Sequence, residues 1–100
     1  MPEPTLQGWT FLSNHGHVLL CIARNPDARV RDISRLVGIT ERAVQRILGE
    51  LEAGHVLARE RRGRRTHYAI EPSAHLRHPL EAHRSVGDLV RLVDPSPDAS

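Results

Sequence analysis

Two glycines that follow short helical patterns divide the middle of the chain, and they constrain its fold more than any other feature. A helix is predicted over residues 31–37, with its apolar side chains at inward spacing, and Gly38 supplies the left-handed residue that ends it. Thr40 can cap a further helix that runs to about residue 53, where Gly54 is expected to end the helix in the same way. A helix, a glycine-containing turn and a second helix in this order predict a helix-turn-helix.

A largely buried helix is predicted ahead of this pair. It is expected to begin at Ser13 or Asn14, either of which can act as its cap, and to run to about Arg24. The Asn-Pro-Asp turn at 25–27 ends it, because proline disfavours helix in the residue before it. Residues 28–30 read as a short extended piece. With 100 residues, the chain is long enough for one domain and one core.

A hairpin and a last helix are predicted after the helix-turn-helix. Residues 56–61 and 66–70 have the pattern of two strands, joined by a turn at 62–65. The last helix is expected to open at Pro79, which suits a first helical position, and to run to about Val93. Its apolar positions exceed what a terminal helix needs for itself, which favours a homodimer. The predicted dimerisation residues are Leu80, Val86, Leu89, Val90 and Val93.

The distribution of charge indicates an anionic partner that meets the protein at one place. All 14 basic residues are arginine. Five of them lie with one glutamate in residues 59–65, a net charge of +4, whereas the other 93 residues hold nine arginines against eleven acidic residues. Nucleic acid is the usual partner of such a patch.

Several classes of protein do not fit the sequence. Cys21 is the one cysteine, so neither an internal disulfide nor a Cys-x-x-Cys zinc site is expected. The longest apolar run has six residues, too few for a membrane span, and no leader is expected, so a cytoplasmic protein is predicted. His75, His78 and His83 lack the i, i+4 spacing of a helical metal site. No phosphate cradle or nucleophile motif is present, and we expect neither enzyme activity nor a cofactor.

The third predicted helix is a candidate for reading DNA. Its apolar residues occupy one arc, and the opposite face carries Arg42, Gln45, Arg46 and Gly49. An arginine can hold guanine in a bidentate pair, and a glutamine can do so with adenine. Gly49 weakens the helix but permits close approach of a bulky partner. Thr40 and the free amides at the start of the helix could take a phosphate, and the alternative is an ordinary solvated helix face.

The arginine-rich turn of the hairpin is the second candidate contact, as a wing on the minor groove or backbone. The bland alternative is a solubilising loop, although five arginines in seven residues are more than a loop needs. Weaker phosphate candidates lie on the second helix and on the return strand. The wing candidates are Arg61, Arg62, Arg64 and Arg65, and the weaker ones are Arg31, Arg35 and His67.

Three segments resemble bacterial MarR-like winged helix-turn-helix transcription regulators. Residues 30–40 (VRDISRLVGIT) are similar to the positioning helix and turn of that family, residues 41–48 (ERAVQRIL) to its recognition helix, and residues 51–56 (LEAGHV) to the junction into the wing. The resemblance covers residues 14–70. It implies a regulator that dimerises, although MarR regulators are usually longer and dimerise through helices from both ends.

The sequence thus predicts a mainly α protein with a small β-hairpin, a three-helix core plus wing and an additional C-terminal helix. Its expected divisions are an N-terminal segment (1–12), a winged helix-turn-helix (13–71), a C-terminal dimerisation helix (75–93) and a flexible tail (94–100). The predicted function is that of a nucleoid-associated, sequence-specific regulator of transcription that binds double-stranded DNA, with no effector inferred. The alternatives are a protein-interaction module and a non-specific nucleic-acid binder that uses the arginine patch.

Overall fold

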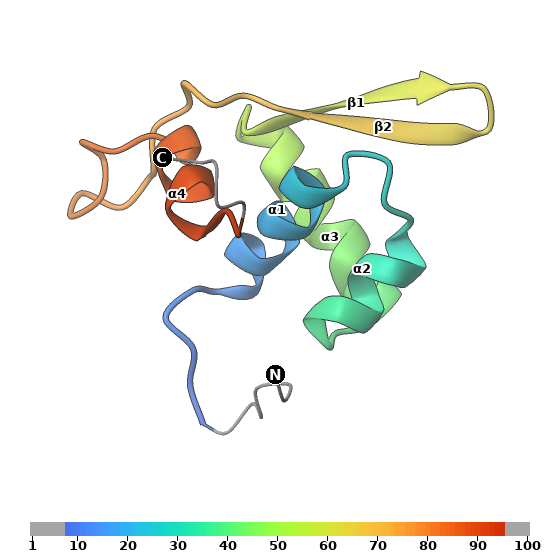
Figure 1. Ribbon diagram of the computed structural model, residues 1–100, viewed down its shortest axis with the longest axis horizontal. Helices are drawn as coiled ribbons and strands as arrows, with labels where there is room; N and C mark the ends of the chain where they lie inside the picture. The colour runs from blue at the N-terminus through green and yellow to red at the C-terminus, as the bar shows by residue number, and fades with distance from the viewer. Residues whose placement is uncertain (1–7, 96–100) are drawn as a thin grey trace.

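The computed structural model describes residues 8–95, and residues 1–7 and 96–100 of the predicted end segments lie outside that range. Within it, four helices and a two-stranded antiparallel sheet follow one another along the chain (Figure 1). None of these helices is long and apolar enough to cross a membrane. The predicted winged helix-turn-helix arrangement is confirmed. The elements are α1 (Asn14–Arg24), α2 (Val30–Val37), α3 (Glu41–Ala53), β1 (Leu57–Arg62), β2 (Arg65–Ile70) and α4 (Val86–Val93).

The turn between α2 and α3 is held by short local hydrogen bonds. Gly38 takes a left-handed conformation with φ 85°, and its amide donates to the carbonyl of Ser34 at 2.8 Å. The Ser34 hydroxyl donates to the carbonyl of Ile39, which closes the turn. Thr40 then caps α3, because its Oγ1 accepts the amide three residues further on at 3.0 Å. The predicted stop and cap are therefore both in place, although α2 begins one residue early, at Val30.

The end of α3 differs from the prediction by one residue. Gly54 has φ −84° and ψ 5°, so it is not the left-handed residue. His55, with φ 62°, takes that conformation instead. The amide of Val56 donates to the carbonyl of Leu51 at 2.9 Å, and the amide of His55 donates to the backbone carbonyl of Glu52 at 3.0 Å. This pair of bonds is a Schellman motif, whose left-handed position follows the C-cap residue, so the geometry of the turn places the strain on His55.

One apolar core joins the three N-terminal helices to the base of the hairpin. Its members alternate with exposed polar residues at helical spacing in α1 and α3, which is why these two helices can pack on each other and on α2. The fully buried side chains of α3 all point to this core, so the opposite face of the same helix is left outside. The core residues are Val18, Ile22, Ala28, Ile33, Val44, Ile47, Leu48, Leu57 and Tyr68.

The hairpin turns more tightly than expected. The strands pair from Leu57 with Ile70 to Arg62 with Arg65, so the turn has two residues instead of four. Gly63 permits it, because φ at this residue is 63°. The base of the hairpin is anchored by the buried Leu57, while the outer part extends past the helices into solvent (Figure 1).

The last helix is much shorter than predicted. It begins at Val86 instead of Pro79, and residues 71–85 form a series of turns. Ser85 is the N-cap of this helix, because Ser85 and Asp88 form a capping box in which each side chain accepts the amide of the other residue. The amide of Val86 also donates to Ala74 at 2.7 Å, which ties the loop to the helix start.

A second apolar cluster docks α4 on α1 and on the end of α3. Leu19, Val56 and Val86 are its buried members, and Leu89 and Val90 pack against them partly buried. Val86 is 2% exposed, so it serves the protein's own core and is not available to a second copy, contrary to its predicted role in dimerisation. Leu80 lies in the loop instead of the helix and is 81% exposed.

Candidate nucleic-acid interface

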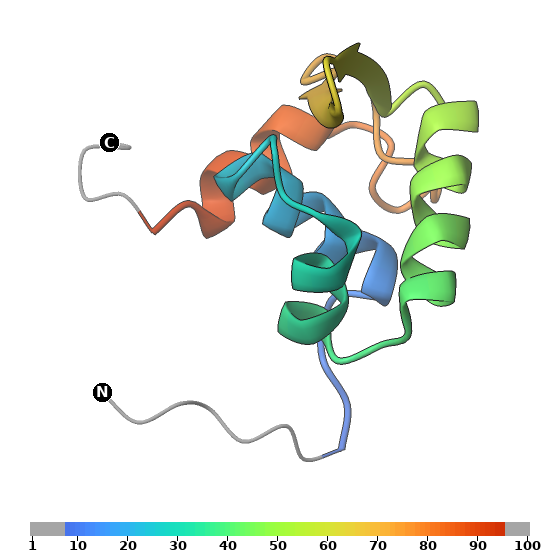
Figure 2. The ribbon, with the colours of Figure 1, turned by 90° about the vertical axis from the view of Figure 1, so that its right-hand side faces the viewer.

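The exposed face of α3 carries the side chains that the helical spacing predicted. Arg42, Gln45 and Arg46 are exposed, and Gly49 is half-buried one turn further on. In Figure 2, α3 stands at the right-hand edge of the molecule, with α1 and α2 on its other side. No acidic side chain stands among these four positions, so the face presents mainly hydrogen-bond donors to the outside. Such a face matches the acceptor-rich edge of guanine and the mixed edge of adenine.

The two arginines of this face have different surroundings. The side chains of Arg42 and Gln45 make no hydrogen bond or ion pair with any residue in the described range. Arg46 Nη1 lies 3.4 Å from Glu50 Oε1, and that oxygen also lies 2.7 Å from His15 Nε2 on α1. The hydrogen bond from His15, followed by the charge of Arg46, holds the pKa of the Glu50 carboxyl below its usual range. Sequence reasoning missed this link, because nothing in the pattern joins two residues 35 positions apart.

Gly49 has no structural requirement within the protein. A Cβ at this position would meet only the Arg59 Nη2 atom, at 3.9 Å, which is an ordinary van der Waals contact. The helix therefore has room for alanine here and carries glycine at a cost in helix stability. Of the described glycines, it is the one on the outer face of α3. Packing within the described protein therefore does not require glycine here, and a partner that approaches this face is the remaining explanation.

The arginines of the wing are all exposed and lie at its outer end. Arg61 Nε donates to the carbonyl of Gly63 at 3.1 Å, and Arg62 Nη2 lies 3.4 Å from Glu60 Oε2. Arg64 occupies the turn and has no partner among the described residues. Arg65 reaches back and donates to the carbonyl of Asp27 at 3.1 Å. Three of these four cations are therefore restrained by weak surface contacts that an anionic ligand can replace.

Two polar contacts fix the base of the wing. Arg59 Nε lies 3.2 Å from Glu52 Oε1, which ties β1 to α3. On the other strand, His67 Nδ1 lies 2.8 Å from Asp27 Oδ1, and this hydrogen bond is the main cause that lowers the pKa of the Asp27 carboxyl. The His67 side chain is only 22% exposed, so the structure places it against the loop at 25–28. These contacts join the base of the wing to α3 and to the loop at 25–28.

The remaining candidates lie at the start of α3 and on α2. The Thr40 oxygen is occupied as a cap, but its hydroxyl hydrogen remains available as a donor beside the first amides of α3. Arg31 and Arg35 are exposed on α2, and Arg35 lies 3.6 Å from Asp32 on the same helix. The structure thus places Thr40 directly beside the α3 face, and it places the two α2 arginines on the neighbouring element.

The structure also describes the surroundings of the histidines and of Cys21. In the described part of the chain, no three His, Cys, Asp or Glu side chains lie together as a metal-binding group would. The His75 ring instead contacts the carbonyl of Ala82 at 2.8 Å. Cys21 is half-buried on α1, and this burial raises the pKa of its thiol, which disfavours the reactive thiolate.

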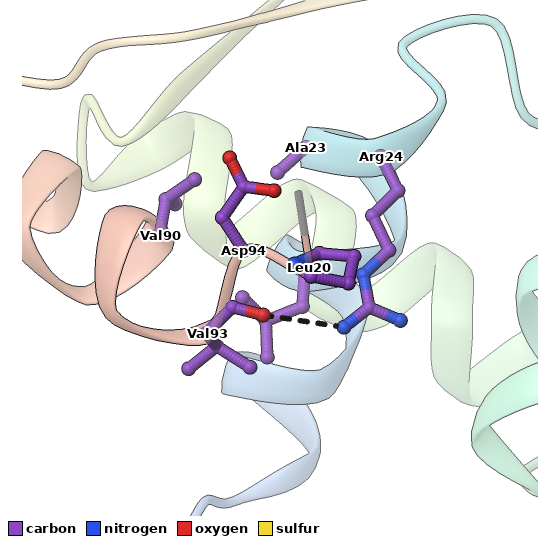
Figure 3. Close-up of a pocket in the computed structure, with 7 residues that line it drawn as sticks. Leu20, Ala23, Arg24, Val90, Val93 and Asp94 are labelled. Carbon is purple, nitrogen blue, oxygen red and sulfur yellow. Dashed lines mark hydrogen bonds between the residues drawn. The ribbon is translucent and has the colours of Figure 1, made fainter. Parts of the chain in front are cut away.

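A shallow groove between α1 and α4 lies apart from the α3 face. It has a volume of about 470 Å³ and is mainly apolar, and Arg24 Nη2 at its rim donates to the carbonyl of Val93 at 3.4 Å (Figure 3). Leu92 on α4 is 81% exposed. The lining residues are Leu20, Ala23, Arg24, Val90, Val93, Asp94 and Pro95.

Comparison with known proteins agrees with the winged helix-turn-helix arrangement of the fold. Residues 13–57, just under half of the chain, match a family described as winged helix-turn-helix DNA-binding. No curated protein matches the chain. The match covers all three N-terminal helices and ends at the first residue of β1, so it supports DNA binding by the helix-turn-helix, and the arginines of the wing lie outside it.

Proposed function

We propose that this protein is a sequence-specific regulator of transcription that binds double-stranded DNA. In this proposal, α3 lies in the major groove and the wing lies beside it on the minor groove or the phosphate backbone. The observation that carries the proposal is the outer face of α3, where two arginines, a glutamine and a glycine with no structural requirement share one exposed surface. The tight hairpin beside it adds four exposed arginines.

Each residue has a distinct role in this proposal. Arg42 and Arg46 hold guanine through their planar forks, and Gln45 pairs with adenine. Gly49 lets the DNA backbone or a base edge approach the helix. The hydroxyl of Thr40 and the first amides of α3 bind a phosphate. The other phosphate contacts are assigned to Arg31, Arg35, Arg61, Arg62, Arg64, Arg65 and His67.

We further propose that the protein acts as a homodimer through α4 and the groove beside it. The support is the exposed Leu92 and the open apolar groove that Val90 and Val93 line. A two-fold dimer presents two copies of α3, so its operator is a palindrome with half-sites about one helical turn apart. Regulation then follows from occupancy of a promoter.

The salt dependence of binding tests the proposal against its two alternatives. Fluorescence anisotropy with a labelled pool of random-sequence duplexes gives the affinity between about 50 and 200 mM salt, the range over which counterion release changes affinity strongly. We expect a steep linear fall of log K with log salt. A protein-interaction module does not bind the pool at any of these concentrations. An arginine-driven non-specific binder shows the same steep fall, but the pool gains no affinity after rounds of selection.

A further inference from the structure

Glu50 stands in a position that three ordinary effects disfavour. It lies in the last turn of α3, where the negative end of the helix dipole opposes a carboxylate. Its pairing with Arg46 has the basic residue on the N-terminal side, the weaker order for an i, i+4 pair. It also borders the face that would meet phosphates, which repel it. Stability of α3 alone therefore gives little reason for a carboxylate at this position.

The carboxylate nevertheless has a second partner, which comes from a different element. His15 Nε2 on α1 lies 2.7 Å from Glu50 Oε1, the same oxygen that faces Arg46 Nη1 at 3.4 Å. The pKa of Glu50 is lowered, so the carboxylate is ionised at neutral pH and the His15 ring donates to it through Nε2. Because α1 and α3 pack in the same core, the contact with His15 favours a Glu50 orientation in which Oε1 faces both His15 and Arg46.

This arrangement restricts Arg46 and leaves most of its donors available. A guanidinium has five N–H groups, and the contact with Glu50 uses one of its terminal nitrogens. The other donors remain on the exposed side, where the Arg46 side chain is 61% exposed. Holding a long side chain before binding reduces the rotamer freedom that it loses on binding. The Arg42 side chain has no such partner among the described residues, so it is not restrained in this way before binding.

We propose that Glu50 and His15 are positioning residues for DNA recognition: His15 holds the Glu50 carboxylate, and Glu50 orients the Arg46 guanidinium toward one base. This inference rests on the proposed function, because it assigns the specificity of the same α3 face. It makes Arg46 the more discriminating of the two arginines and Arg42 the more adaptable one. It also gives α1, which carries no base-reading residue, a part in specificity.

The test compares base preference in four variants that are each first checked for folding by circular dichroism. In vitro selection with the wild type supplies a duplex, and Arg46→Ala identifies the base position at which preference is lost. Glu50→Ala and His15→Ala are then compared with Glu52→Ala, a control that removes one negative charge from the same helix but pairs with Arg59 instead. Affinity is measured for the selected duplex and for duplexes changed at each position.

We expect the discrimination at the base position assigned to Arg46 to be about tenfold lower in Glu50→Ala than in the wild type. A loss of this size lies within the range that one bidentate pair provides. His15→Ala loses a smaller part at the same position. Glu52→Ala keeps full discrimination. Glu50→Ala and Glu52→Ala both bind unrelated duplexes more tightly, because each removes a charge that repels phosphates.

The outcomes separate this inference from the function on which it rests. If the wild type binds no duplex, the proposed function fails, and the inference fails with it. If the wild type selects a sequence but Glu50→Ala keeps the discrimination of Glu52→Ala, only the positioning role is overturned. The same holds if Arg46→Ala loses no base preference, or if Glu50→Ala weakens binding equally at all positions.

Discussion

At the scale of single residues, the outer face of α3 combines side chains that donate hydrogen bonds with one that has no side chain at all. Arg42, Gln45 and Arg46 were predictable from the sequence, because a period of 3.6 residues places them opposite the apolar arc. The conformation at the end of α3 was not predictable in the same way. The left-handed residue is His55, although the glycine beside it is the better candidate by residue type.

Replacing Gly49 with alanine separates the needs of the fold from those of the ligand. Because a Cβ meets only the end of the Arg59 side chain, Gly49→Ala is expected to raise the free energy of unfolding by about 1 kcal/mol, the difference in helix propensity. The same variant is expected to bind DNA more weakly. Urea unfolding and anisotropy measure the two effects. A variant that is more stable and binds DNA as well as the wild type would show that Gly49 lies outside the contact.

At the scale of the elements, the wing and α4 show what local sequence signals can and cannot determine. The hairpin followed from its strand pattern and its glycine, and only the length of the turn differed. For α4, Pro79 is an acceptable helix start, but the capping box at Ser85 and Asp88 is a stronger one. The loop before it packs Leu76 into the second cluster, a tertiary contact that no local pattern encodes.

The contribution of the wing can be measured as a number of phosphate contacts. Arg62→Ala/Arg64→Ala is expected to reduce the slope of log K against log salt by about 0.9 for each contact removed. As a control, Arg77→Ala/Arg84→Ala removes the same charge from the exposed loop at 71–85. This loop lies on the side of the molecule opposite the outer end of the hairpin (Figure 1). The control is expected to leave the slope nearly unchanged. Equal reductions in both variants would argue for a general effect of net charge.

At the scale of the whole molecule, the α3 face and the groove beside α4 are separate surfaces that the same α1 helix connects. The sequence predicted the order of elements and the core of α1, α2 and α3, because these depend on local periodicity and caps. It could not predict that Val86 is buried, or that His15 contacts Glu50, because both depend on how distant elements pack. The interior thus takes one of the five residues expected at a dimer interface.

The proposed dimer depends on an exposed position of α4. Leu92→Asp places a charge on this surface without disturbing the core, because Leu92 is 81% exposed. We expect the wild type to sediment as a dimer and the variant as a monomer, with weaker binding to a palindromic duplex and unchanged binding to a half-site. A wild type that remains monomeric at micromolar concentration, or a variant that remains dimeric, would contradict this interface.

Acid is expected to destabilise the protein through its paired carboxylates. Hydrogen bonds or nearby cations lower the pKa of Asp27, Glu50, Glu71 and Asp88 in the folded state. The folded state therefore binds fewer protons than the unfolded one. The stabilisation is present above the ordinary pKa values, 4.5 for Glu and 3.8 for Asp, and is lost as the pH falls through the lower folded values. We expect the melting temperature to decrease as the pH is lowered past about 4. A melting temperature that stays constant or rises over this pH range would contradict this account.

In vitro selection from a pool of duplexes tests the central claim most directly, when it is run in parallel with the wild type and with Arg42→Ala/Arg46→Ala. At about 100 mM salt, where specific binders normally hold their sites, we predict that the wild type enriches one palindromic sequence. The double variant should retain DNA through its wing but lose that sequence. Enrichment of the same sequence by both proteins, or of none by the wild type, would contradict the claim that the outer face of α3 reads DNA.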